Sequence, residues 1–145
     1  MIIVSLAGGL GNQMFQYAIG RRLALERNVQ LKLDLSWFRS QEKRQYRLDQ
    51  FQINAEIATL SEIAFFRKNN WPTLLRKIYE KVQVKYPRWL GQVVTHPTSS
   101  FYPQVFQTSK HAYLYGYWQS EKYFSSIAPL IRQELQLKRT FSTEN

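Results

Sequence analysis

The sequence contains no cysteine, which excludes a disulfide framework, thiolate metal sites and a cysteine nucleophile. Long hydrophobic runs are also missing, since no stretch approaches the roughly 20 apolar residues that a membrane-spanning helix needs. The first residues, MIIVSLAGGLGNQ, lack the basic region that opens a secretory signal peptide. We therefore expect a cytoplasmic protein that is soluble or peripheral at the inner face of the membrane.

Residue types that ligate metals are equally scarce. The sequence has no Asp-x-Asp pair, and its two histidines, His96 and His111, stand alone. A zinc or calcium ion needs several such ligands together, and a solitary histidine is more often structural or exposed. We therefore expect neither a metal site nor a cofactor.

Acidic residues number 10 against 20 lysines and arginines, which gives a formal net charge of +10. Residues 67–88 hold seven of the basic residues and one acid. This balance suits an anionic partner, such as a sugar nucleotide, acidic lipid headgroups or nucleic acid, although a solvated helix face would have the same composition. Specific nucleic-acid binding is disfavoured because the basic residues follow one edge of an amphipathic helix and are not interleaved with stacking aromatics.

The first 35 residues carry the pattern of a βαβ unit. Residues 2–6 are apolar and β-branched, as in a strand that is buried on both faces. A glycine-rich turn over 7–12 precedes a helical pattern over 13–27, and residues 30–35 alternate in polarity as a second strand does. This order predicts the α/β class, with a Rossmann-like parallel sheet and flanking helices.

The remaining segments give weaker patterns. Residues 36–58 are irregular, and 59–70 predict a short helix that Thr59 or Ser61 caps. The other expected elements are an amphipathic helix over 74–86 ending at Pro87, a loop over 95–104, a strand over 112–117, and helical turns over 120–137 with Pro129 near the start of the second piece.

The glycine turn is the strongest functional pattern. Gly8, Gly9 and Gly11 lie between a strand and a helix, where a ligand can approach the backbone without meeting a Cβ. The amino end of the helix favours a diphosphate, although the same turn can be purely structural. A dinucleotide fingerprint is excluded because its third glycine falls on Met14, and no Gly-Lys-Ser/Thr follows as in a P-loop. The amides of Asn12 and Gln13 can bind sugar hydroxyls or phosphate oxygens, and Asn12 can also serve as the helix N-cap.

Three segments together resemble a known family. Residues 8–24, GGLGNQMFQYAIGRRLA, are similar to the amino-terminal signature of the bacterial alpha-1,2-fucosyltransferases, glycosyltransferase family eleven. The segments YRLDQFQI at 46–53 and GYWQSEKYF at 116–124 resemble further parts of that family in the same order and spacing. The resemblance therefore spans most of the chain.

The resemblance implies a galactoside alpha-1,2-fucosyltransferase, which moves L-fucose from GDP-fucose to a galactose 2-hydroxyl with inversion and without a metal. It implies that residues 1–145 are the amino-terminal Rossmann-like lobe of a two-lobed, GT-B-type enzyme, with a basic helical segment at 67–92. The residues expected to bind GDP-fucose are Gly9, Leu10, Gly11, Asn12 and Gln13, and those expected near the same cleft are Tyr117, Trp118 and Gln119. An aromatic pair after a strand can equally pack in the core.

One signature of that family is absent. The resemblance implies a His-x-Arg-Arg-x-Asp segment in a carboxy-terminal donor lobe, whose arginine neutralises the diphosphate leaving group, and the 145 residues contain no such segment. We therefore expect a fragment that is inactive alone, and we identify no catalytic residue in it. Asp34, Asp49 and Glu121 are equal candidates for a general base, and each is equally well explained as a surface charge.

Two other functions remain open on the sequence. A lone Rossmann-like lobe could bind a glycan or a nucleotide without turnover. The helix expected over 74–86 has lysines along one edge, so residues 74–89 could dock on an acidic membrane, or the apolar side of the helix could pack on the domain core.

Overall fold

The computed structural model describes residues 1–67, 77, 91–96 and 100–138. The strands are β1 (Ile2–Ser5), β2 (Leu31–Asp34), β3 (Glu56–Ile57), β4 (Gln92–Thr95) and β5 (Ala112–Tyr115), and the helices are α1 (Leu10–Glu26), α2 (Leu60–Phe66) and α4 (Ala128–Glu134). Short 3-10 helices occupy Ser36–Ser40, Leu48–Gln50, Pro103–Gln107, Glu121–Tyr123 and Ser125–Ile127. In this described part, no helix is both long and apolar enough to cross a membrane.

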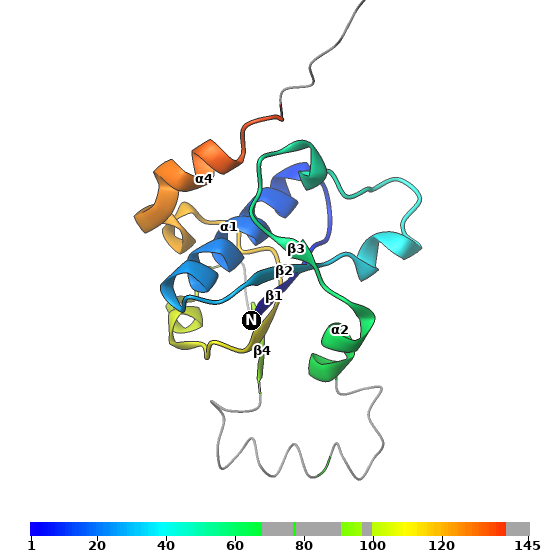
Figure 1. Ribbon diagram of the computed structural model, residues 1–145, viewed down its shortest axis with the longest axis vertical. Coiled ribbons are helices and arrows are strands. Elements are labelled where there is room, and N and C mark those ends of the chain that lie inside the picture. The colour runs from blue at the N-terminus through cyan, green and yellow to red at the C-terminus, as the bar shows by residue number, and fades with distance from the viewer. Residues whose placement is uncertain (68–76, 78–90, 97–99, 139–145) are drawn as a thin grey trace, which may run out of the picture.

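The five strands form one parallel sheet in the order β3-β2-β1-β5-β4 (Figure 1). β1 lies at the centre, where Val4 pairs with Leu33 of β2 on one side and with Leu114 of β5 on the other. All four residues of β1 are buried, as its unbroken apolar sequence predicts. The expected α/β class, with a Rossmann-like parallel sheet and flanking helices, is confirmed.

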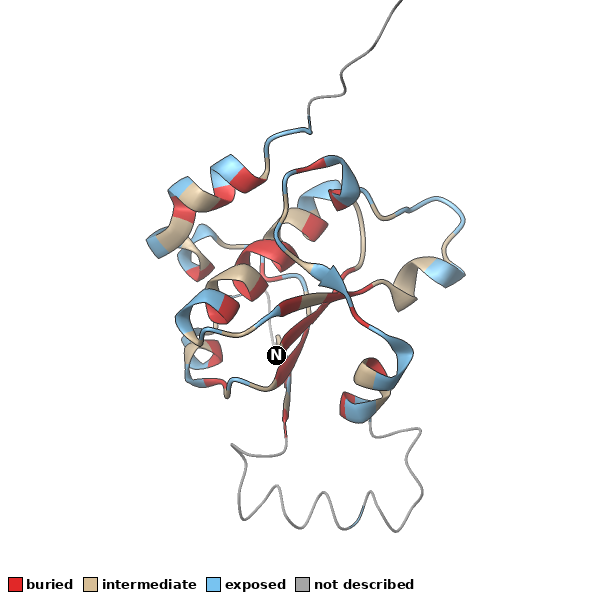
Figure 2. Cartoon of the chain, viewed as in Figure 1, coloured by how far each residue is buried: buried red, intermediate tan, exposed pale blue. Residues whose placement is uncertain are grey.

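Alternate residues of β1 face two separate cores. Val4 belongs to the larger cluster, together with Ile19 of α1 and Ile131 of α4. Ile3 belongs to the smaller cluster, together with Phe66 of α2. Helix α1, with α4 beside it, therefore packs on one face of the sheet and α2 packs on the other. In Figure 2, β1 is coloured as buried along its length, and buried residues recur along α1.

Helix α1 begins at Leu10, three residues earlier than the sequence pattern predicts, and Gly9 is its N-cap. The expected N-cap role of Asn12 is therefore wrong, because Asn12 lies inside the first turn of the helix. Farther along, Gly20 lets α1 approach the sheet closely. A Cβ at Gly20 would lie 2.8 Å from the Cδ1 of Leu31.

Side-chain hydrogen bonds hold α2 and α4 in place. Thr59 caps α2 in a capping box with Glu62, which confirms one of the two expected caps. The carboxylate of Glu134 in α4 accepts hydrogen bonds from the Tyr17 hydroxyl at 2.5 Å and from the Nε and Nη2 of the Arg21 guanidinium. Burial, followed by the hydrogen bond to Glu134, raises the pKa of Tyr17. This buried network joins α4 to α1.

Some expected elements differ in the structure. The helical turns over 120–137 are two 3-10 helices followed by α4, and Pro129 lies in the first turn of α4 as predicted. The strand expected over 112–117 ends at Tyr115. The loop expected over 95–104 starts within β4, a strand of four residues that is too short to give a periodic pattern.

The segment at 36–58, expected to be irregular, contains two 3-10 helices and the two-residue strand β3. Except for residue 77, the helix expected over 74–86 lies outside the described residues, as does most of the basic segment at 67–92. Docking of residues 74–89 on an acidic membrane therefore stays a prediction.

Candidate functional site

The strand order reverses at the centre of the sheet, between β1 and β5. From β1 the chain continues to β2 and β3 on one side, whereas β5 and β4 lie on the other side. Ligands of open α/β sheets bind in the crevice outside the carboxyl ends of the strands at such a switch point. The segments that follow β1 and β5 are therefore the first candidates for a binding site.

The turn after β1 leads into α1 without blocking its amino end. Gly8 has a φ of 79°, a left-handed conformation that residues with a Cβ rarely adopt. Gly9 is extended and offers no capping side chain, and the first turn of α1 holds no acid. The first backbone hydrogen bond of the helix runs from the Gln13 N–H to the Gly9 carbonyl. The backbone amides before it are therefore available to an anion, which the helix dipole also favours.

The buried amide of Gln16 joins this turn to the segment after β5. Its Oε1 accepts a hydrogen bond from the Ala7 N–H at 3.0 Å, and its Nε2 donates to the Gly116 carbonyl at 2.9 Å. Gly116 has a φ of 142°, and a Cβ there would lie 2.5 Å from the Cβ of His96. Sequence analysis did not identify this role of Gln16. The available signal was a glutamine next to the apolar positions of the predicted helix.

The expected cleft residues after β5 have different environments. Gln119 is exposed, and its Nε2 donates to the Asn12 Oδ1 at 2.5 Å, which links two amides 107 positions apart. The Tyr117 side chain is also exposed. Trp118 is fully buried, has a φ of 54° and packs against the His96 ring at 4.8 Å between centroids. Trp118 is therefore a core residue, whereas Asn12, Gln119 and Tyr117 remain able to touch a ligand.

Among the described residues, the indole N–H of Trp118 is the single buried side-chain polar group without a hydrogen-bond partner. An unpaired buried donor costs about 1–3 kcal/mol, and a positive φ at a residue with a Cβ adds strain. The segment after β5 is therefore held in a locally unfavourable conformation.

Gln13 is completely buried, and hydrogen bonds engage both ends of its amide. Its Nε2 donates to the Gln45 carbonyl at 2.9 Å and to the Gly8 carbonyl at 3.2 Å. Its Oε1 accepts from the Arg47 backbone N–H at 3.0 Å. The side chain of Gln13 therefore holds segment 45–47 against the glycine turn through hydrogen bonds. Direct contact between Gln13 and GDP-fucose stays a prediction.

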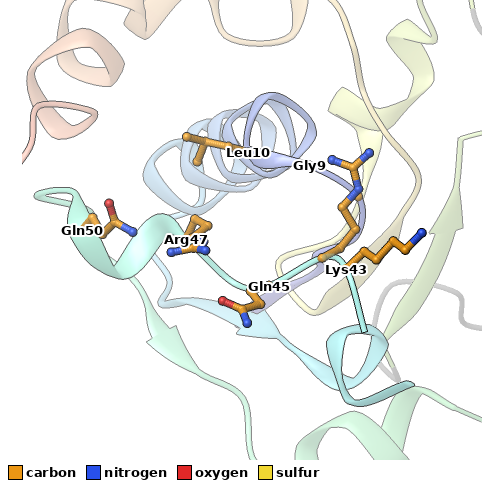
Figure 3. A pocket seen from close by; sticks show the side chains of 8 residues that line it. Gly9, Leu10, Lys43, Gln45, Arg47 and Gln50 are labelled. Atoms are coloured by element: carbon orange, nitrogen blue, oxygen red, sulfur yellow. The ribbon is translucent and has the colours of Figure 1, made fainter. Parts of the chain in front are cut away.

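A pocket of about 480 Å³ lies between the glycine turn and this segment (Figure 3). Its lining residues are Gly8, Gly9, Leu10, Lys43, Arg44, Gln45, Arg47 and Gln50. In Figure 3, the side chains of Lys43, Gln45, Arg47 and Gln50 lie along the chain that runs past the amino end of α1. The pocket wall thus includes two of the expected ligand-binding residues, Gly9 and Leu10, and three basic side chains that sequence analysis missed.

Gly11 lies on another surface of the amino end of α1. It lines an apolar groove of about 430 Å³ between α1 and α4, together with Met14 and Phe124. A Cβ at Gly11 would have no heavy atom within 4 Å. Packing within the chain therefore does not require glycine at this position.

Asp34 ends β2 and is fully buried, so its interpretation as a surface charge is wrong. One carboxylate oxygen accepts hydrogen bonds from the backbone N–H and the hydroxyl of Ser36. The other accepts from the Tyr113 hydroxyl at 2.6 Å and lies 3.5 Å from the Arg67 guanidinium. Burial, followed by the hydrogen bond to Asp34, raises the pKa of Tyr113 to about 12.

Asp49 and Glu121, the other two candidates for a general base, are exposed. The carboxylate of Glu121 lies 3.5 Å from the Arg132 guanidinium in an exposed ion pair. The environments of these two residues therefore fit the surface-charge interpretation.

The two histidines occupy separate structural positions. The His96 Nε2 lies 2.8 Å from the Tyr123 hydroxyl, and burial lowers the pKa of His96. The His111 Nδ1 lies 3.2 Å from the amino terminus, and burial also lowers the pKa of His111. Within the described ranges, no three residues of the types His, Cys, Asp and Glu gather as a metal site would require.

Comparison with known proteins finds a relative that the chain matches over part of its length. The chain is similar to an alpha-1,2-colitosyltransferase of Escherichia coli, with 31% identity over 136 residues. The matched region covers 92% of this chain and 44% of the relative, so the chain spans less than half of the relative's length. No family model matches the sequence, and no solved structure matches it.

Proposed function

We propose that the chain forms the amino-terminal lobe of a two-lobed, GT-B-type glycosyltransferase that makes an alpha-1,2 linkage, with GDP-fucose as donor and a galactoside as acceptor. The observation that carries this proposal is the hydrogen bond between Asn12, in the first turn of α1, and Gln119, in the segment after β5, at the switch point of the sheet. The similarity to an alpha-1,2-colitosyltransferase supports the same class of reaction.

The reaction that we propose is a single displacement with inversion. The acceptor 2-hydroxyl oxygen attacks the anomeric carbon of the donor, the bond from that carbon to the diphosphate oxygen breaks, and GDP leaves with the bonding electrons. The hydroxyl proton passes to a base, for which no described residue is assigned. Because negative charge grows on the diphosphate, preorganised donors near it give the largest catalytic benefit.

The described residues offer such donors at the glycine turn. The free amides at the start of α1 can bind phosphate oxygens, and the helix dipole favours their charge. The exposed amide pair of Asn12 and Gln119 can bind sugar hydroxyls, because each side chain retains a free donor or acceptor after their mutual hydrogen bond. We propose that this chemistry proceeds without a metal or a cofactor.

The donor sugar is the part of the proposal that needs its own test. Colitose lacks the 3-hydroxyl of fucose and is otherwise the same sugar. Both activated sugars would therefore present the same diphosphate and the same anomeric centre to this lobe. A site that binds the 3-hydroxyl through a buried polar group would reject the deoxy sugar strongly, whereas an apolar site would discriminate weakly.

A chimera tests the proposed function. The matched region of the Escherichia coli relative would be replaced by the aligned residues of this chain, and transfer would be assayed from GDP-fucose and from GDP-colitose to lactose. We expect a product that carries the new sugar on the galactose 2-hydroxyl. A folded chimera that makes no such product, beside an active parent enzyme, would contradict the proposal. Saturable GDP binding without transfer would favour a non-catalytic binding module instead.

A further inference from the structure

The pocket beside the glycine turn contains positive charge without internal compensation. Lys43, Arg44 and Arg47 line it, and none of its lining residues is an acid. Among the described residues, the side chains of these three cations form no ion pair and no hydrogen bond. By contrast, Arg21 and Arg22 of α1 pair with carboxylates. The free cations of the pocket therefore remain available to an anionic ligand.

The position of Arg44 relative to the turn supports a ligand site. A Cβ built on Gly9 would lie only 3.1 Å from the Nη1 of Arg44. The guanidinium therefore lies directly beside the turn, close to the free amides of α1. An anion at this place can contact backbone N–H groups and a guanidinium together.

The segment that carries these cations is fixed by a buried side chain. The Gln13 amide bonds to the Gln45 carbonyl and to the Arg47 N–H, so the backbone between Arg44 and Arg47 is held against the glycine turn. The Gln13 side chain is fully buried and both hydrogen bonds are partly buried, which limits competition with water. The two arginines are thus presented from an ordered backbone on one side of the pocket.

We infer that Arg44 and Arg47 bind the diphosphate of the nucleotide donor at the glycine turn, and that Gln13 is a positioning residue that holds them there. This inference rests on the proposed function and assigns its diphosphate subsite to residues of this lobe. Guanidinium groups match phosphate oxygens with two parallel hydrogen bonds each. Two or three cations beside a helix amino end favour a negatively charged diphosphate over a neutral glycan.

Calorimetric titration of the 145-residue chain with inorganic pyrophosphate and with GDP tests the inference. We expect both probes to bind, and Arg44→Ala or Arg47→Ala to weaken each by at least about tenfold, the scale of one lost charge-assisted hydrogen bond. Lys110→Ala is the matched control. Lys110 is exposed and precedes β5, so it lies at the amino ends of the parallel strands, whereas the glycine turn lies at their carboxyl ends. Its removal should leave the affinity for both probes within about twofold.

Different results separate the inference from the proposed function. Absence of binding by the unaltered chain, or equal binding by the arginine variants and Lys110→Ala, would overturn the inference. Equal GDP binding in all variants would leave the proposed transferase function intact. Arginine-dependent binding in which GDP is no tighter than pyrophosphate would support the anion pocket and count against a nucleotide donor. Circular dichroism of each variant shows whether it is folded.

Discussion

The side-chain oxygen of Gln13 accepts a hydrogen bond from the backbone N–H of Arg47 at 3.0 Å. This contact joins the first helix to a segment 34 positions later, which otherwise has little regular structure. A polar residue of the glycine motif thus supports one wall of the basic pocket. The Gln13 amide bonds to backbone groups of the protein through both its oxygen and its nitrogen.

Gln13→Leu should lower the free energy of unfolding by about 1–3 kcal/mol, because it removes three partly buried hydrogen bonds to backbone groups of the turn and of segment 45–47. Urea denaturation measures this change. Gln119→Leu is the control, since Gln119 is exposed and its loss should change stability by about 0.5 kcal/mol or less. Equal stability of Gln13→Leu and the unaltered protein would refute the supporting role.

The two glycines inside α1 should respond to alanine in opposite ways. Gly20→Ala should destabilise the fold by about 1–3 kcal/mol, because the added methyl meets Val4 and Leu31 of the sheet. Gly11→Ala meets no atom and should be neutral or stabilising by up to about 1 kcal/mol, since alanine favours the helix. Thermal unfolding compares the two, and a similar loss of stability in both would contradict the packing of α1.

The Gly11→Ala variant also separates ligand approach from folding. If GDP needs the bare backbone of Gly11, this variant should bind GDP more weakly while it keeps full stability. Titration of the variant with GDP measures the effect. Unchanged GDP affinity would remove Gly11 from the expected ligand-binding residues.

Alkaline pH should destabilise the protein through Tyr113. Burial and the hydrogen bond to Asp34 raise the pKa of Tyr113 from 10.0 to about 12. Between these values the unfolded chain loses the tyrosine proton and the folded chain keeps it, so the free energy of unfolding falls as the pH rises. Urea denaturation between pH 9 and pH 12 measures the fall. Tyr113→Phe should show a smaller decline, and an equal decline in both proteins would contradict this linkage.

The sequence predicted the elements that carry a local pattern. The apolar strand at 2–6, the glycine turn, the helix after it and the alternating strand at 30–35 all correspond to observed elements. Thr59 was predictable as a cap because Glu62 follows it at the spacing of a capping box. These features depend on neighbours within a few positions.

The parts that sequence analysis missed depend on distant contacts. Asp34 has the spacing of an exposed residue on an alternating strand, but Tyr113 and Arg67 cover its face of the sheet. Arg44 and Arg47 lie in a segment without periodicity, and their place beside the turn depends on hydrogen bonds from Gln13. No local pattern could have predicted these positions.

The 145-residue chain alone should release no GDP from GDP-fucose, with or without lactose. The resemblance to fucosyltransferases implies an arginine segment that these residues do not contain, and removing one preorganised donor at a developing charge typically costs about a hundred- to a thousandfold in rate. A GDP-release assay checks this expectation. Clear turnover by the chain would show that the described lobe contains the catalytic groups.

The central claim is that the donor diphosphate binds at the glycine turn after β1, in the pocket between this turn and residues 43–47. An NMR titration of the ¹⁵N-labelled chain with GDP-fucose tests it most directly, because backbone amide shifts report the binding place residue by residue. We predict that the largest shift changes occur at residues 8–13, 43–47 and 116–119, the segments that surround the pocket and the Asn12–Gln119 pair. Shift changes confined to the pocket at residues 28–31 and 53–56, at the amino ends of β2 and β3, would contradict the claim. The absence of any shift change would also contradict it.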